Sequence, residues 1–190
     1  MTNKVKKQGA IKNFRALRKI TTVILVLTTL AVCFAGCKDN KVASGEPEYG
    51  VNEDGTLYVS AAGKLTDGNI VIPSEHDGKK VTGIGTGAFF EKKDITGVTI
   101  PQSITAIGED AFRGCEKITA VNYNGTIAQW CNIKFASASS NPCRNGADLY
   151  IQGKKITDLN ISSKGTSDEV LSIGDYAFTG CGSLRSVTLG

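Results

Sequence analysis

Apolar and polar residues alternate in short stretches along most of the chain. Alternation over a few residues is typical of a β-strand, because successive side chains point to opposite faces. The stretches are residues 56–60, 98–100, 121–123, 159–161 and 187–189. The first of them follows an Asp-Gly pair, which favours a turn. The pattern therefore predicts a series of short strands.

These strands belong to an internal repeat. Residues 81–89 match residues 104–112 at an offset of 23, and residues 105–115 match residues 171–181 at an offset of 66. The shared pattern is I-x-x-V-x-I-P-x-x-I-x-x-I-G-x-x-A-F-x-G-C, with one short strand in each copy. A period of roughly 20–29 residues with one strand is the range of leucine-rich repeats. We expect a repeat solenoid: a right-handed stack of coils, each with a strand and an irregular or short-helical arc over about 23 residues.

The repeat also predicts which side chains form the core. In one coil the inward positions are Ile95, Val98, Ile100, Ile104, Ile107, Ala111, Phe112 and Cys115. Gly108 and Gly174 fall where the chain is expected to turn too tightly for a side chain. Pro73 and Pro101 are expected to end their strands, where a missing amide donor does no harm.

The N-terminal region differs in composition from the repeats. Residues 1–37 hold seven Lys or Arg and no acidic residue, so the formal charge of +4 becomes −3 without them, with 15 basic against 18 acidic residues. Sixteen uncharged residues follow the basic stretch, at 20–35. A membrane-spanning helix needs roughly 20 apolar residues, and shorter runs are typical of signal peptides. The remaining chain is slightly acidic, which argues against a nucleic-acid partner.

The end of this region resembles the lipobox of bacterial lipoproteins. Phe34, Ala35 and Gly36 precede Cys37, although Leu is usual in the family where Phe34 stands. The resemblance implies that a signal peptide, residues 1–36, is removed and that Cys37 carries the lipid. Two acyl chains suffice for stable anchoring. The protein would then be exported and lipid-anchored to the bacterial cell membrane or outer surface; the alternative is an uncleaved membrane anchor.

The chain divides into three parts on this interpretation. Residues 37–52 are polar and rich in turn formers, which predicts a flexible tether. Residues 53–190 form the repeat domain, with an irregular insert at about 124–150. The last repeat stops within a strand, so we expect a missing C-terminal cap. Such an end would mean a truncated chain or end-to-end self-association.

From about residue 56 to residue 190, the repeat strongly resembles the BspA-like (Treponema pallidum type) leucine-rich repeat family. The A-F-x-G-C motif carries the resemblance, and the insert, including Trp130 and Asn141-Pro142, is similar too. Ser162 departs from the family pattern, since Pro occupies its equivalents 73 and 101. The resemblance implies a non-enzymatic surface adhesin that attaches to extracellular-matrix proteins or to other cells. The alternative is a passive spacer of the cell envelope with no specific ligand.

The third and fifth positions of each I-x-x-V-x-I strand are expected to point outward on the concave face of the stack. This face is the candidate surface for a protein or glycan ligand. Its residues are Asn69, Val71, Gly97, Thr99, Ala120, Asn122, Asp158, Asn160, Ser186 and Thr188. They are small and mostly polar, which predicts modest affinity.

Four cysteines fall in the repeat domain. Cys115 and Cys181 share one repeat position, which favours small buried thiols. Cys131 and Cys143 lie in the insert and are either free thiols or a disulfide. The chain has no C-x-x-C pair and a single histidine, His76, so we expect no metal site.

We also expect no catalytic residues and no cofactor. His76 lies between Glu75 and Asp77 in a polar turn, where neighbouring side chains do not converge on one reacting atom. The glycines of residues 83–87 follow from the repeat and lack the Lys-Ser/Thr of a phosphate-binding loop. Trp130 either anchors a partner or covers the open side of the stack.

Overall fold

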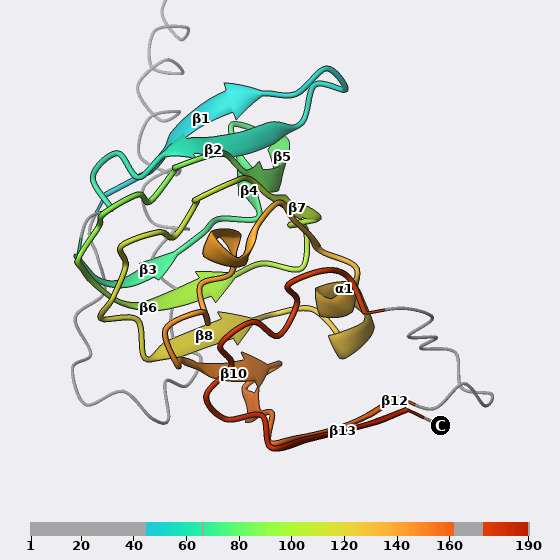
Figure 1. The fold of residues 1–190 in the computed structure, drawn as a ribbon. Coiled ribbons are helices and arrows are strands. Elements are labelled where there is room, and N and C mark those ends of the chain that lie inside the picture. The colour runs from blue at the N-terminus through green and yellow to red at the C-terminus, as the bar shows by residue number, and fades with distance from the viewer. Residues whose placement is uncertain (1–44, 66, 162–172, 190) are drawn as a thin grey trace, which may run out of the picture. The chain divides into compact units, whose positions relative to one another are not determined.

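Short strands form most of the structure, a computed structural model that describes residues 45–65, 67–161 and 173–189 (Figure 1). The predicted signal peptide and Cys37 lie outside the described residues. In that range no helix is long and apolar enough to cross a membrane. The elements are β1 (Glu48–Val51), β2 (Leu57–Ala61), β3 (Asp67–Val71), β4 (Glu75–His76), β5 (Lys79–Ile84), β6 (Asp94–Ile100), β7 (Ala106–Ile107), β8 (Ala120–Tyr123), α1 (Ile127–Cys131), β9 (Lys134–Phe135), η1 (Ala138–Ser140), β10 (Asp148–Ile151), β11 (Lys154–Lys155), β12 (Asp158–Ile161) and β13 (Ser186–Leu189). Strands are present at all five alternating stretches.

The chain passes back and forth between two sheets, so that each turn adds a strand to each of them (Figure 1). The first sheet has the order β11-β10-β8-β6-β3, and the second has the order β1-β2-β5-β7-β9, with β4 beside β5. Strands of successive turns are parallel, whereas β1, β4 and β11 are antiparallel hairpin partners. This is a β-solenoid of about four turns, and it confirms the predicted coil stack.

The register shows how the stack accepts turns of different length. Val98 pairs with Val121, at the offset that the repeat predicts. Val121 then pairs with Leu149, at a larger offset. The segment 124–150, expected as an irregular insert, is thus a longer turn of the same stack that includes α1, β9, η1 and the start of β10.

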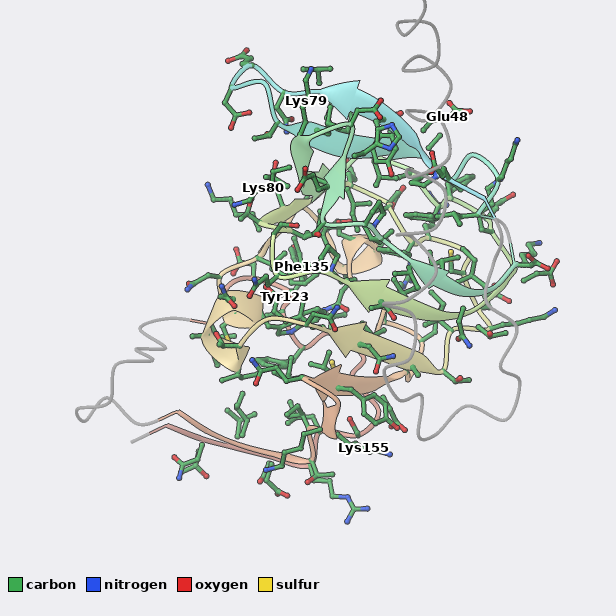
Figure 2. All side chains as sticks on the ribbon, turned by 180° about the vertical axis from the view of Figure 1, so that it is seen from behind. Glu48, Lys79, Lys80, Tyr123, Phe135 and Lys155 are labelled. Carbon is green, nitrogen blue, oxygen red and sulfur yellow. The ribbon has the colours of Figure 1, made fainter. Side chains whose placement is uncertain are left out.

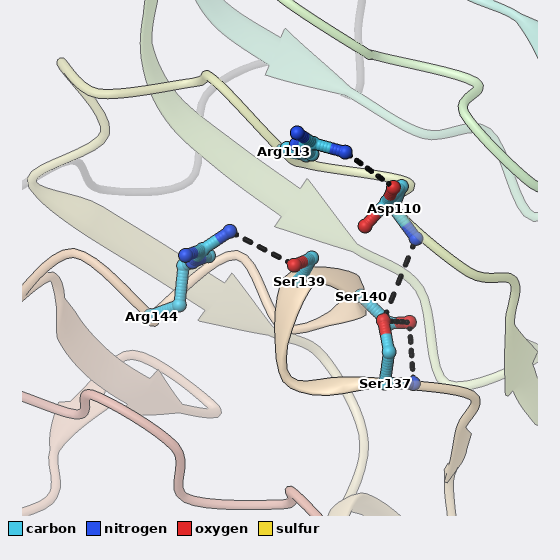
Figure 3. Close-up of polar contacts among 6 residues, drawn as sticks. All are labelled: Asp110, Arg113, Ser137, Ser139, Ser140 and Arg144. Atoms are coloured by element: carbon cyan, nitrogen blue, oxygen red, sulfur yellow. Dashed lines mark hydrogen bonds and ion pairs between the residues drawn. The ribbon is translucent and has the colours of Figure 1, made fainter.

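Local hydrogen bonds hold the irregular part of this longer turn. Thr126 caps α1: its Oγ1 accepts from the Gln129 amide at 3.2 Å, and the Gln129 side chain accepts from the Thr126 amide at 2.8 Å. Close to η1, the Ser137 amide donates to Ser140 Oγ at 2.9 Å (Figure 3). The Asp110 amide of the preceding turn donates to Ser137 Oγ, and this bond links the two turns.

A continuous apolar core fills the space between the sheets. All eight inward positions predicted from the repeat are buried. Trp130 is fully buried, with an exposed fraction of 0%, and its ring makes edge-to-face contacts with Tyr123 and Phe135. Its Nε1–H donates to Ala177 O at 2.8 Å. Figure 2 labels Tyr123 and Phe135. It therefore belongs to the core and is no exposed anchor for a partner.

Glycine is needed at Gly108 and Gly174, but not for the tight turn expected from the sequence, since neither residue has a positive φ. A Cβ at Gly108 would overlap the backbone of Thr86 in the preceding turn, and one at Gly174 would lie 2.8 Å from Cys131 O. The requirement for glycine comes from this close approach of neighbouring turns. Pro101 directly follows the last residue of β6.

Candidate binding face of the first sheet

The outward positions of the first sheet line up in two rows across four parallel strands. Asn69, Gly97, Ala120 and Asp148 form the first row. Val71, Thr99, Asn122 and Tyr150 form the second row. The residues between the rows, Ile70, Val98, Val121 and Leu149, are buried in the core, as the alternation of a strand requires. We call these eight outward residues the outer face.

The first row is less accessible than the sequence predicts. Asn69 has an exposed fraction of only 1%, and Gly97 and Ala120 are also buried. The Asn69 amide lies where a side chain of Gly97 would be, since a Cβ at Gly97 would overlap Asn69 Oδ1. The expectation that Asn69 is an exposed contact residue is therefore wrong, because the missing side chain of its neighbour leaves a space that the amide fills.

The second row is partly exposed along its whole length. Val71, Thr99, Asn122 and Tyr150 are all half-buried. Tyr150 contributes the one aromatic side chain among these four residues. Aromatic side chains with a polar tip are the type enriched at binding surfaces. The side chains of the outer face that a ligand can contact therefore lie mainly in the second row.

Asp148 and Tyr150 are not among the face residues that the repeat pattern predicts. Both belong to residues 147–151, where the alternation was visible but was assigned to the insert. Asp148 Oδ2 accepts from Lys155 Nζ at 2.6 Å, and this hydrogen bond raises the pKa of Lys155. Lys155 lies on β11, at the end of the first sheet (Figure 2).

The other four predicted face residues lie on a separate pair of strands. Asp158 and Asn160 are on β12, Ser186 and Thr188 are on β13, and all four are exposed. Ser186 Oγ donates to Asp158 at 2.6 Å, and this bond, followed by one from Thr157, lowers the pKa of Asp158. The exposed fraction of Val187 on β13 is 45%. End-to-end self-association stays a prediction.

The four cysteines of the described range are free thiols in this structure. Cys131 ends α1 and is buried, and burial raises its pKa to about 11. Cys143 is also buried, in the turn that follows η1. A disulfide between Cys131 and Cys143 stays a prediction.

A second feature of the surface is an open groove of about 680 Å³ over the second sheet. Its lining includes Tyr58, Lys134 and the glycines Gly83, Gly85 and Gly108. Tyr58 packs against two of these glycines, 3.2 Å from the Cβ position of Gly83 and 3.1 Å from that of Gly85. In the sequence, only the glycines at 83, 85 and 87 point to this groove, and the repeat pattern already accounts for them.

His76 lies in a hairpin and contacts a tyrosine. Its ring stacks on the ring of Tyr49 at a centroid distance of 4.1 Å. His76 Nε2 lies 3.4 Å from Asp77 Oδ2, and His76 Nδ1 lies 3.9 Å from Glu46 Oε2. Burial, and then the charges of Glu46 and Asp77, raise the pKa of Tyr49 to about 12. No group of three or more metal-ligating side chains occurs in the part of the chain that the structure describes.

Similarity to known proteins agrees with this architecture. The family model for the BspA type leucine-rich repeat region matches residues 68–144 and 146–190, with six copies. No curated protein matches the chain.

Three solved structures are similar to this chain. The T. pallidum leucine-rich repeat protein is 17% identical, with a TM-score of 0.41 over 74% of this chain and 78% of that one. A leucine-rich cell surface protein from Faecalibacterium prausnitzii A2-165 is 21% identical, with a TM-score of 0.49 over 81% of this chain and 44% of that one. A leucine-rich repeat protein from Bacteroides capillosus ATCC 29799 is 21% identical, with a TM-score of 0.45 over 75% and 92%.

The matched family residues include every strand from β6 to β13 and most of the longer turn. Because the family model matches more than half of the 190 residues, the assignment does not depend on the solved structures. The chain belongs to the BspA type leucine-rich repeat family.

Proposed function

We propose that this protein is a bacterial cell-surface lipoprotein that binds a protein or glycan ligand through the outer face of its first sheet. The ligand would belong to a host matrix or to another cell. The observation that carries the proposal is the second row, in which Val71, Thr99, Asn122 and Tyr150 stand side by side on four strands in register. Leucine-rich repeat stacks expose broad surfaces of this kind to macromolecular partners.

The composition of the row sets the expected strength of binding. It contains one aromatic residue and two small polar ones, and it lacks the Trp and Arg anchors that dominate tight interfaces. We expect modest affinity for a single copy and stronger attachment when many copies are anchored to one surface.

The membrane anchor is the second part of the proposal. Its support is the sequence alone: the basic start, the 16 uncharged residues and the Ala-Gly-Cys ending at Cys37. In a lipoprotein-competent bacterium, the protein in the membrane fraction should lack residues 1–36 and carry a diacylglycerol-sized added mass. Intact mass spectrometry tests this, with Cys37→Ser as the variant that abolishes both changes. An unprocessed wild-type mass would show an uncleaved N-terminal anchor instead, and Phe34 would be its first suspected cause.

The outer face is tested by a panel of immobilised matrix proteins and glycans. Asn122→Arg places a long charged side chain in the middle of the row, and Tyr150→Ala removes its aromatic ring. Each change should weaken saturable binding at least tenfold. The control is Gln102→Arg, which adds the same charge at an exposed position that follows β6 and is not part of the row.

The same experiment distinguishes the ligand-binding role from a passive spacer. A spacer would give no saturable binding on any surface of the panel. Binding that survives both changes in the row but disappears with Tyr58→Ala would assign the ligand to the groove of the second sheet. Circular dichroism and thermal unfolding of every variant show whether the fold is retained.

A further inference from the structure

Two cysteines in neighbouring turns lie against each other. Cys143 is buried in the core, and Cys181 packs against the same core while staying half-exposed. The backbones around them are in direct contact: a Cβ at Gly180 would overlap Arg144, and the Gly182 amide donates to Ala147 O at 3.0 Å. These contacts bring residues 180–182 onto residues 144–147.

The equivalent cysteine of an earlier copy shows where such a side chain points. Cys115 shares the repeat position of Cys181, and its Sγ reaches back across the stack to donate to Phe89 O at 3.0 Å. Its neighbour Gly114 lies against Glu91, so the thiol contacts a residue two positions before that point. Gly180 lies against Arg144, so the same geometry directs the Cys181 thiol to Pro142, the residue next to Cys143.

The electrostatic environment of Cys143 identifies the same neighbour. Burial raises the pKa of Cys143 well above its ordinary value, and a side-chain hydrogen bond with Cys181 adds to the shift. Burial alone raises the pKa of Cys131, and no thiol contributes to it. The hydrogen bond with Cys181 agrees with the backbone contacts that bring residues 180–182 onto residues 144–147.

We propose that Cys143 and Cys181 form a disulfide that joins two neighbouring turns when the protein meets a disulfide-bearing oxidant. The Cys181 thiolate attacks one sulfur of the oxidant's disulfide and releases one thiolate. Cys143 then loses its proton and attacks Cys181 Sγ, which releases the second thiolate. The two cysteines give up two protons and two electrons, and the oxidant's disulfide becomes two thiols.

The order of these steps follows from accessibility. Cys181 is half-exposed and can reach the oxidant, whereas Cys143 is enclosed by the core. Because the thiolate is the attacking species, a buried thiol of raised pKa is a poor first nucleophile. Its contact with Cys181 supplies the proximity that the second step needs.

Peptide mapping tests the pairing in the full chain. Trypsin places each cysteine of the described range in its own peptide: residues 114–117, 118–134, 135–144 and 165–185. After reduction, removal of reductant and incubation with oxidised glutathione, peptide 135–144 should be recovered linked to peptide 165–185. A link between 118–134 and 135–144 would overturn the proposal in favour of Cys131 and Cys143. Recovery of both thiols unlinked would overturn it as well.

Variants add a measurement of stability. The oxidised wild type should unfold about 10 °C above the Cys181→Ser protein, because the bridge closes a long loop in the unfolded chain. Under reducing conditions this difference should fall to a few degrees. Cys131→Ser is the matched control, since it removes a buried thiol and should leave the linked peptides in place.

Discussion

At the scale of single residues, the most informative atom of the core is the hydroxyl of Tyr123. The side chain is buried, and its oxygen has no hydrogen-bond partner among the described residues. Burial raises the pKa of Tyr123 to about 12. Ionisation of this phenol therefore favours the unfolded chain, in which its pKa is about 10.

We predict that Tyr123→Phe leaves the protein as stable as the wild type at pH 7.5, or slightly more stable, because an unsatisfied buried hydroxyl is lost. The raised pKa contributes stability that is complete below pH 10 and disappears as the pH rises to about 12. The variant should therefore lose up to about 3 kcal/mol less than the wild type over this interval.

Urea unfolding at pH 7.5 and at several values between 9 and 12 measures both effects. The thiols of Cys115 and Cys131, whose pKa values burial raises to about 11, contribute the same alkaline loss to both proteins. Parallel stability curves for the two proteins over the whole range would contradict the prediction.

At the scale of elements, the close packing of successive turns depends on glycine. The Gly108 amide donates to Ile84 O at 2.8 Å, which draws the turn directly onto the backbone of residues 85 and 86. A side chain at this position cannot be accommodated by rotating a neighbouring side chain, since the atoms in its way belong to the backbone.

We predict that Gly108→Ala destabilises the protein by about 2 kcal/mol, through strain in the contact between β5 and β7. The control is Gly83→Ala on β5, whose new Cβ would lie 3.2 Å from the Cβ of Tyr58 and needs only a small shift. Chemical denaturation of the three proteins provides the comparison. Equal stability of the two variants would show that the turns can separate without cost.

The elements also show what the sequence could predict. The repeat pattern identified β6 and β8, since their inward apolar residues recur at an interval of 23. It assigned β7 to an irregular or short-helical arc, although β7 is a strand of the second sheet. It missed β10 as a strand of the first sheet, because the longer turn widens the interval between equivalent strand positions and hides Tyr150 from the alignment.

Contacts between distant residues were beyond the reach of the pattern. The stacking of His76 on Tyr49 depends on how two hairpins meet, and the burial of Asn69 depends on a missing side chain one turn away. The contact of Cys143 with Cys181 depends on the path of the longer turn, which the repeat pattern does not predict. These features depend on contacts between turns, whereas a repeat motif describes the residues of one copy.

At the scale of the whole molecule, the solenoid is built by addition. Every parallel strand pair joins one turn to the next, and the core is continuous only because the turns are stacked. The stability of the described part is therefore close to a sum of neighbour contacts. The proposed bridge between Cys143 and Cys181 would strengthen one of these contacts and leave the others unchanged.

The ladder of parallel strands has a mechanical consequence. A pull on one end of the stack loads only the hydrogen bonds of the outermost turn, because the strands of the next turn are held by a ladder of their own. The domain would yield by peeling off one turn at a time, each releasing its whole length of chain before the next is loaded. A molecule built in this way lengthens in steps under tension and absorbs work at each of them.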